Sequence, residues 1–245
     1  SFLRVGQLEL FARRVRNNDH DEALNELKMI VQHLIDRNYK DEIEHGISLE
    51  SKVIKLACLY RSRLISLVTN WMRVGYCQGN FNSDNCAAGG FTLDYGPFGF
   101  CELFDPRFQP WTGGGEHFSF FNQPSAAAIN FKTFCSSLSP LLSESKQAKE
   151  KLDQIERDFS ELMNIRLKKM WANKLGLEHY NETLINEFFN LMVISKADYT
   201  ILFRKLSEIP DNLDSLKDSF YLPINDELNN SCLLYTSDAA DDVLC

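Results

Sequence analysis

The feature that most constrains the fold is a glycine pair inside a stretch rich in acid and amide side chains, residues 82–99. Gly89-Gly90 separates two short runs of strand-compatible residues. A glycine pair supplies the positive φ angles that a two-residue hairpin turn requires. The spacing therefore predicts a small β-hairpin in which residue 88 pairs with residue 91, so that Asn85 faces Asp94 across the ladder.

The predicted hairpin places oxygen-bearing side chains close enough to share a cation. Cross-strand partners have Cβ atoms about 4.5–5.5 Å apart, and Mg²⁺ usually takes one or two oxygen ligands from protein side chains. Asp84 and Asp94 at about 5 Å would repel by roughly 3 kcal/mol at an effective dielectric near 20, and a bound cation would relieve that repulsion. The alternative is a turn whose amide and acid side chains only bond backbone groups. Spacing alone leaves both interpretations open.

Composition limits the classes of protein that the chain can belong to. Its 245 residues are 44% hydrophobic and include 18 Phe, which is ample for a packed core. A net charge of −8 without a lysine or arginine cluster argues against nucleic acid as the main partner. No apolar run is long enough to span a membrane. The seven cysteines form no CxxC pair, which favours free thiols in a reducing compartment.

Apolar periodicity predicts that most of the chain is helical. We expect helices over residues 20–38 and 48–73, the second with Ser48 as its N-cap and a short strand after it at residues 74–77. Beyond residue 140 the pattern predicts one long amphipathic helix over 144–174 and a further helix after Asn181. The fold class expected is therefore α+β and mostly α.

At the glycine-containing stretch the chain resembles a known family. Cys77-Gln78-Gly79-Asn80-Phe81-Asn82-Ser83-Asp84-Asn85, the run Phe91 to Phe100, and Asp105-Pro106 are similar to the catalytic core of the selenoprotein O family. The likeness continues to about residue 210. It departs at Gln78, where the family typically has His, and at Cys86-Ala87, where the family often has Met-Ser. The resemblance implies a protein-kinase-like fold and transfer of AMP from ATP to hydroxyl side chains of proteins.

The same resemblance implies roles for individual residues. Asp84 is similar to the family's catalytic base, and Asn85 and Asp94 are similar to its ligands for Mg²⁺, a site that Mn²⁺ could also fill. Arg4 occupies the position of an arginine in the nucleotide site, where Asp94 also contributes. An arginine suits phosphate because its planar fork donates two hydrogen bonds at once. Without the resemblance, Arg4 reads as a solvent-facing residue on an edge strand.

The resemblance also predicts how the chain is organised. Residues 1–140 are expected to form the C-lobe of a kinase-like domain with a small catalytic β-hairpin, and residues 141–230 a helical extension. Residues 231–245 look like a translated adaptor and are excluded from the fold. The lobe that covers the nucleotide is expected upstream, so we expect this fragment alone to be inactive.

The expected partners are ATP and protein substrates with hydroxyl side chains, without nucleic acid or membrane. The expected location is mitochondrial for a eukaryotic protein and otherwise cytoplasmic, not secreted. Two other functions remain open on the sequence. One is a phosphotransferase with the same metal site, and the other is a non-catalytic helical interaction module.

Overall fold

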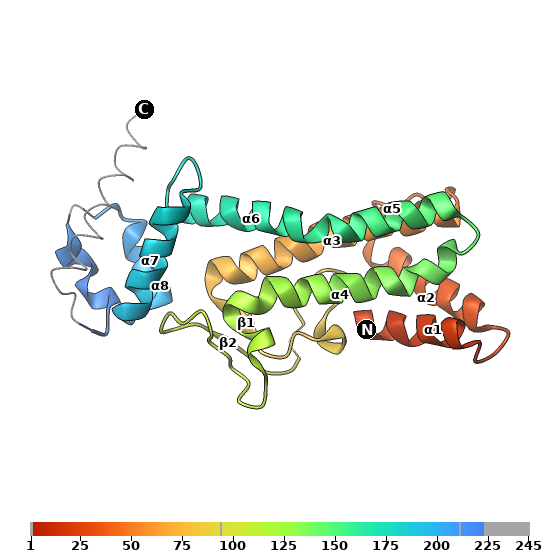
Figure 1. Cartoon of the computed structure of the whole chain (residues 1–245), viewed down its shortest axis with the longest axis horizontal. Coiled ribbons are helices and arrows are strands. Elements are labelled where there is room, and N and C mark those ends of the chain that lie inside the picture. Colours follow the sequence, from red (N-terminus) through yellow and green to blue (C-terminus); the bar gives the residue numbers. More distant parts are fainter. Residues whose placement is uncertain (1, 94, 211, 223–245) are drawn as a thin grey trace. The chain divides into compact units, whose positions relative to one another are not determined.

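The computed structural model of the chain describes residues 2–93, 95–210 and 212–222. This part is mostly helical with one small antiparallel sheet (Figure 1), which confirms the predicted α+β, mostly α class. The helices are α1 (Val5–Asn17), α2 (Ala23–Asn38), α3 (Leu49–Val74), α4 (Gln123–Leu138), α5 (Lys146–Arg157), α6 (Phe159–Lys174), α7 (Glu182–Ile194) and α8 (Tyr199–Leu206); the strands are β1 (Tyr76–Gln78) and β2 (Phe98–Phe100). Among these described residues, no helix has both the length and the apolar content needed to cross a membrane.

The described residues form two compact units that alternate along the sequence. Unit 1 comprises the described residues of 1–68, 80–97 and 122–163, and unit 2 comprises those of 69–79, 98–121 and 164 onward. The boundary at residue 140 between a lobe and an extension stays a prediction. The predicted tail, residues 231–245, lies outside the described residues.

The core of unit 1 is built on the predicted helical periodicity. Helix α3 has Val53, Leu56 and Tyr60 fully buried at three- and four-residue spacing, as expected for one apolar face of a helix. Its start is capped as predicted, because the Ser48 hydroxyl accepts a hydrogen bond from Ser51 N at 3.2 Å. Burying each large aliphatic side chain contributes roughly 1.5–3 kcal/mol, so this face contributes to the stability of unit 1.

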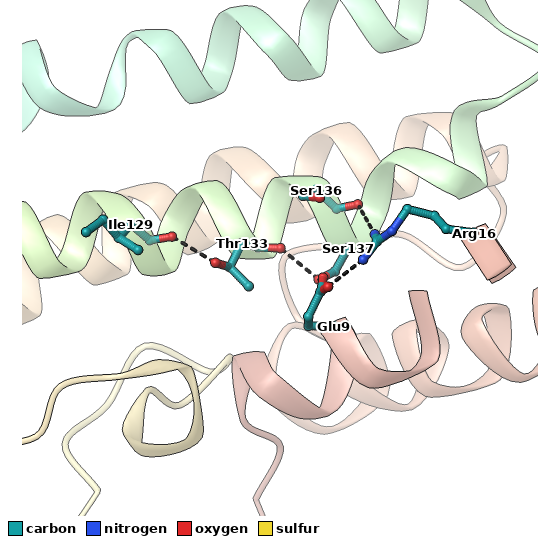
Figure 2. Close-up of polar contacts among 6 residues, drawn as sticks. All are labelled: Glu9, Arg16, Ile129, Thr133, Ser136 and Ser137. Atoms are coloured by element: carbon teal, nitrogen blue, oxygen red, sulfur yellow. Dashed lines mark hydrogen bonds and ion pairs between the residues drawn. The ribbon is translucent and has the colours of Figure 1, made fainter. Parts of the chain in front are cut away.

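A polar network joins α1 to α4 within unit 1 (Figure 2). The Ser137 hydroxyl lies 3.1 Å from Glu9 Oε2 and 2.7 Å from the Thr133 carbonyl oxygen. Arg16 binds the same Glu9 carboxylate through an ion pair and contacts the Ser136 carbonyl oxygen at 3.4 Å. Ser137 is fully buried, and a buried hydroxyl that loses its hydrogen-bond partner is left unsatisfied. The network therefore fixes the position of α1 on α4.

The single long helix predicted over residues 144–174 is wrong in one respect, because α5 ends at Arg157 and α6 begins at Phe159. Arg61 donates a hydrogen bond to the Ile155 carbonyl oxygen at 3.2 Å and pairs with Asp158 at 3.6 Å. In an unbroken helix the Ile155 carbonyl would accept from Phe159 N. The arginine competes for that acceptor at the break, and this contact from a distant helix was invisible in local periodicity.

Unit 2 is organised around the sheet and a cluster of aromatic side chains. Strand β1 pairs with β2 in the register Tyr76 with Phe100 and Gln78 with Phe98. Gly75 ends α3 in the left-handed region at φ +78°, and a Cβ there would lie 2.8 Å from the Tyr199 ring. The Tyr199 hydroxyl donates to the Met72 carbonyl oxygen at 2.7 Å. Tyr199 therefore caps the end of α3.

Candidate functional site

The glycine-containing stretch does not form the predicted hairpin. Cys86 and Ala88 pair with the N-terminal segment instead, since Val5 N donates to the Cys86 carbonyl oxygen and Ala88 N donates to the Leu3 carbonyl oxygen, both at 2.9 Å. The predicted pairing of residue 88 with residue 91 is therefore wrong. The backbone groups of Cys86 and Ala88 are hydrogen-bonded to a segment some eighty positions earlier. Local spacing does not reveal such a partner. The strands that do pair, β1 and β2, lie before and after the stretch.

The turn at the glycine pair is anchored by Tyr39, the C-cap residue of α2, and by Arg63 of α3. Tyr39 donates its hydroxyl hydrogen to the Ala88 carbonyl oxygen at 2.7 Å, and Arg63 donates to the Gly89 carbonyl oxygen at 3.1 Å. Gly90 has φ +75°, and a Cβ there would lie 2.5 Å from the Cβ of Arg63. A tight approach and a left-handed backbone both require glycine at this position.

Cys86 is a buried structural residue rather than a reactive one. Its thiol lies 3.1 Å from the Tyr60 hydroxyl, and burial raises the pKa of the Cys86 thiol to about 12. The thiolate is the reactive form of cysteine, so this side chain is inert near neutral pH. Cys58, Cys77, Cys86, Cys101 and Cys135 are all free thiols, as expected.

A short 3₁₀ helix, η1 (Ser83–Asn85), presents the predicted base and the predicted amide ligand. Asn82 caps it, because its Oδ1 accepts hydrogen bonds from Asp84 N at 3.0 Å and from Asn85 N at 3.1 Å. The Asp84 side chain is exposed, whereas Asn85 is only 6% exposed. One capped turn thus directs an acid outward and an amide inward.

The Asn85 side chain is oriented by a single hydrogen bond. Its Nδ2 donates to the Asn80 carbonyl oxygen at 2.7 Å, and because a carbonyl only accepts, the nitrogen must face Asn80. Asn85 Oδ1 is then buried with no hydrogen-bond partner among the described residues. Leaving a buried acceptor unsatisfied costs roughly 1–3 kcal/mol. Such an oxygen is a suitable ligand for a hard cation.

Asp84 lies against the first turn of α1, where Arg4 is the N-cap. A Cβ placed on Gly6 would lie 2.4 Å from Asp84 Oδ1, and the Arg4 guanidinium contacts the Asp84 backbone carbonyl at 3.5 Å. The positive end of a helix dipole favours a negative charge at this position. The structure therefore brings Arg4, Asp84 and Asn85 together in unit 1.

Asp94 lies outside the described residues, so its pairing with Asn85 stays a prediction. The chain two residues later lies close to Asn85, because a Cβ on Gly96 would lie 3.3 Å from Asn85 Nδ2. Gly96 adopts φ +84°, a conformation for which glycine is suited. In the part of the chain that the structure describes, no group of three or more His, Cys, Asp or Glu side chains is arranged to hold a metal. The oxygen of Asn85 is a buried acceptor without a hydrogen-bond partner among the described residues, and it suits a cation.

Two residues of this site were missed by the sequence analysis. Asn82 could have been identified, since Asn is a preferred N-cap and stands immediately before the Ser83–Asn85 turn. Gly6 could have been noticed as a glycine at the start of a basic helix, where alanine would be the better helix former. What each residue contacts became visible only in the folded chain.

Comparison with known proteins places the chain in a family. The family described as "Protein adenylyltransferase SelO" matches residues 1–235. The chain is 33% identical over 229 residues to the "Protein nucleotidyltransferase YdiU" of Aromatoleum aromaticum, covering 90% of this chain and 41% of that relative. It is 32% identical over 219 residues to the protein of the same name from Flavobacterium johnsoniae, covering 85% of this chain and 38% of the relative.

The chain thus spans about two fifths of the length of these relatives. The family match extends through the Arg4 segment, the Asp84-Asn85 turn and the helices of both units, and it confirms the resemblance inferred from the sequence. This chain belongs to the protein adenylyltransferase SelO family.

Proposed function

We propose that this chain is part of an enzyme that transfers AMP from ATP to Ser, Thr or Tyr hydroxyls of other proteins. The observation that carries the proposal is the buried Asn85 oxygen, which has no hydrogen-bond partner in the described part of the chain. Asn85 follows Asp84 in η1, and the exposed Asp84 side chain lies against the first turn of α1. A carbonyl oxygen left without a donor, in the same turn as an acid whose backbone carbonyl contacts Arg4, suits a cation bound to phosphate.

Each residue of the site has a role in this reaction. The substrate hydroxyl oxygen forms a bond to the α-phosphorus, the bond from that phosphorus to the bridging oxygen breaks, and pyrophosphate leaves. Asp84 takes the hydroxyl proton, and Arg4 neutralises phosphate charge. Asn85 and Asp94 would hold Mg²⁺ or Mn²⁺. When bound, the cation supplies charge neutralisation at the phosphates.

The proposal also includes a protein-kinase-like arrangement of the site, the partners of the protein and its compartment. The base, the amide and the metal-binding acid follow in the order of a protein-kinase C-lobe, although the base and the amide are adjacent here. ATP and hydroxyl-bearing proteins are the proposed partners. A reducing compartment agrees with the five free thiols of the described residues.

The test uses the complete polypeptide and ATP labelled separately at the α- and γ-phosphates. We expect α-label on protein and none from the γ-position. Transfer of γ-label would instead identify a phosphotransferase, and absence of both labels together with no Mg-ATP binding by calorimetry would identify an interaction module.

Variants connect the activity to the site. Asp84→Asn should abolish label transfer, since the amide does not accept the proton, and Asp94→Ala should abolish Mg-ATP binding. Asp41→Asn, a change of the same kind at an exposed residue remote from η1 in the sequence, should retain both. Full transfer by Asp84→Asn would refute the role assigned to Asp84.

A further inference from the structure

We infer that Gly6 is a positioning residue. Because it has no side chain, it leaves the space in which the Asp84 carboxylate takes its working orientation. Gly6 is the second residue of α1, an ordinary helical position without a positive φ angle. Alanine is the better helix former at such a position. Backbone conformation therefore gives no reason for glycine here, and the reason must lie in what the residue contacts.

The contact is with the predicted base and its neighbour. A Cβ on Gly6 would lie 2.4 Å from Asp84 Oδ1, 3.3 Å from Asp84 Cγ and 3.2 Å from the Ser83 hydroxyl oxygen. Carbon and oxygen atoms without a bond between them do not approach to 2.4 Å. A side chain at residue 6 and the present position of the Asp84 carboxylate therefore exclude each other.

When a methyl group is added at residue 6, the carboxylate has to yield. The atoms in the way are the ends of the Asp84 and Ser83 side chains, and Asp84 is exposed, so it can rotate toward solvent. The helix has less freedom, because Glu9 ties α1 to Ser137 of α4 and Arg16 ties it to Ser136 (Figure 2). Residue 84 itself is held at its backbone by the Asn82 cap. The expected consequence is a rotated carboxylate on an intact fold.

The stability expected for Gly6→Ala differs from the stability expected if Gly6 served packing alone. A packing glycine replaced by alanine would destabilise the protein. At Gly6 the substitution should leave stability unchanged or raise it, because alanine favours the helix, while the reaction that needs the carboxylate is lost. The expected loss of kcat rests on the proposed function, whereas the expected rotation of the Asp84 carboxylate does not.

The experiment compares Gly6→Ala with Gly46→Ala in the complete polypeptide. A Cβ at Gly46 would have no atom within 4 Å, so that variant is the matched control. We expect Gly6→Ala to lower kcat for AMP transfer at least about tenfold. The KM for ATP should stay within about twofold of the wild-type value. Its unfolding temperature should not fall, and Gly46→Ala should match the wild type in all three quantities.

A crystal structure of the Gly6→Ala variant provides a readout that does not depend on activity. We expect the Asp84 carboxylate to have rotated while η1 and α1 keep their positions. A carboxylate found in its original place, or a variant that keeps full kcat in an active wild-type background, would overturn the inference. A lower unfolding temperature for Gly6→Ala would also overturn it in favour of packing. A wild type that transfers no AMP would refute the proposed function instead, and the crystallographic result would then decide on Gly6 alone.

Discussion

The phenol of Tyr39 is the contact through which α2 holds the glycine turn, and its removal is a sharp test of the site's architecture. Tyr39 is 1% exposed, and its hydroxyl donates to the Ala88 carbonyl oxygen at 2.7 Å. Tyr39→Phe removes the donor and leaves a buried carbonyl unsatisfied, for which the penalty is roughly 1–3 kcal/mol. The ring is retained, so the stacking of Arg63 over it, 4.1 Å from the ring centroid, is preserved. The change removes the polar contacts of the hydroxyl and keeps those of the ring.

We therefore expect Tyr39→Phe to lower the free energy of unfolding by about 2 kcal/mol, which corresponds to about 4–8 °C in Tm for a chain of this size. Urea unfolding followed by circular dichroism measures the free energy, and a thermal scan measures Tm. Tyr221→Phe is the control, because Tyr221 is 56% exposed and donates to Glu102 at 3.1 Å. That variant should stay within about 0.5 kcal/mol of the wild type. If the two variants lose equally little, the Tyr39 hydroxyl does not anchor the turn.

Three further outcomes follow from the structure. Gly90→Ala should lose more than about 1 kcal/mol in urea unfolding, because φ is +75° and the added Cβ would meet Arg63; an unchanged midpoint would contradict the described turn. Asn82→Ala should lose about 1 kcal/mol and slow AMP transfer, whereas Asn82→Asp keeps the cap oxygen and should retain stability; equal losses in both would argue against capping. Burial lowers the pKa of Lys174 to about 8, so the charged amine is disfavoured in the folded state. The free energy of unfolding should therefore rise with pH between about 8 and the unfolded-state pKa of about 10.4. Lys174→Met should remove that part of the pH dependence in unfolding measurements, and an identical pH profile in both proteins would refute it.

The helices were the most predictable part of the fold. The apolar stripe of α3 and its Ser48 cap follow from 3.6-residue periodicity and from local backbone chemistry, both of which are properties of consecutive residues. The same holds for Asn181, whose side chain accepts from Leu184 N at 3.1 Å at the start of α7. The break between α5 and α6 escaped prediction, and the Arg61 side chain that contacts the chain there comes from far away in the sequence.

The sequence proposed the residues of the candidate site but did not predict their geometry. Asp84 and Asn85 were identified through the family's string of residues, and their adjacency fixes that they leave one turn in different directions. The hairpin inferred for them was wrong, because the partners of residues 86–88 are residues 3–5. A strand pairing between distant segments is decided by long-range packing, which the period of a short stretch does not encode.

The amino-acid sequence by itself determined the mostly helical class, the capped starts of α3 and α7 and the family, and it indicated Asp84 and Asn85 as candidate site residues. Each of these depends on neighbouring residues or on an order of residue types shared with the family. Only the tertiary structure decided that Arg4 and Gly6 meet Asp84, that Asn85 is turned so that its oxygen has no donor in the described part of the chain, and that Tyr39 and Arg63 hold the turn. These contacts join residues tens of positions apart, and they form only when α1, α2 and α3 pack and bring their side chains to one place.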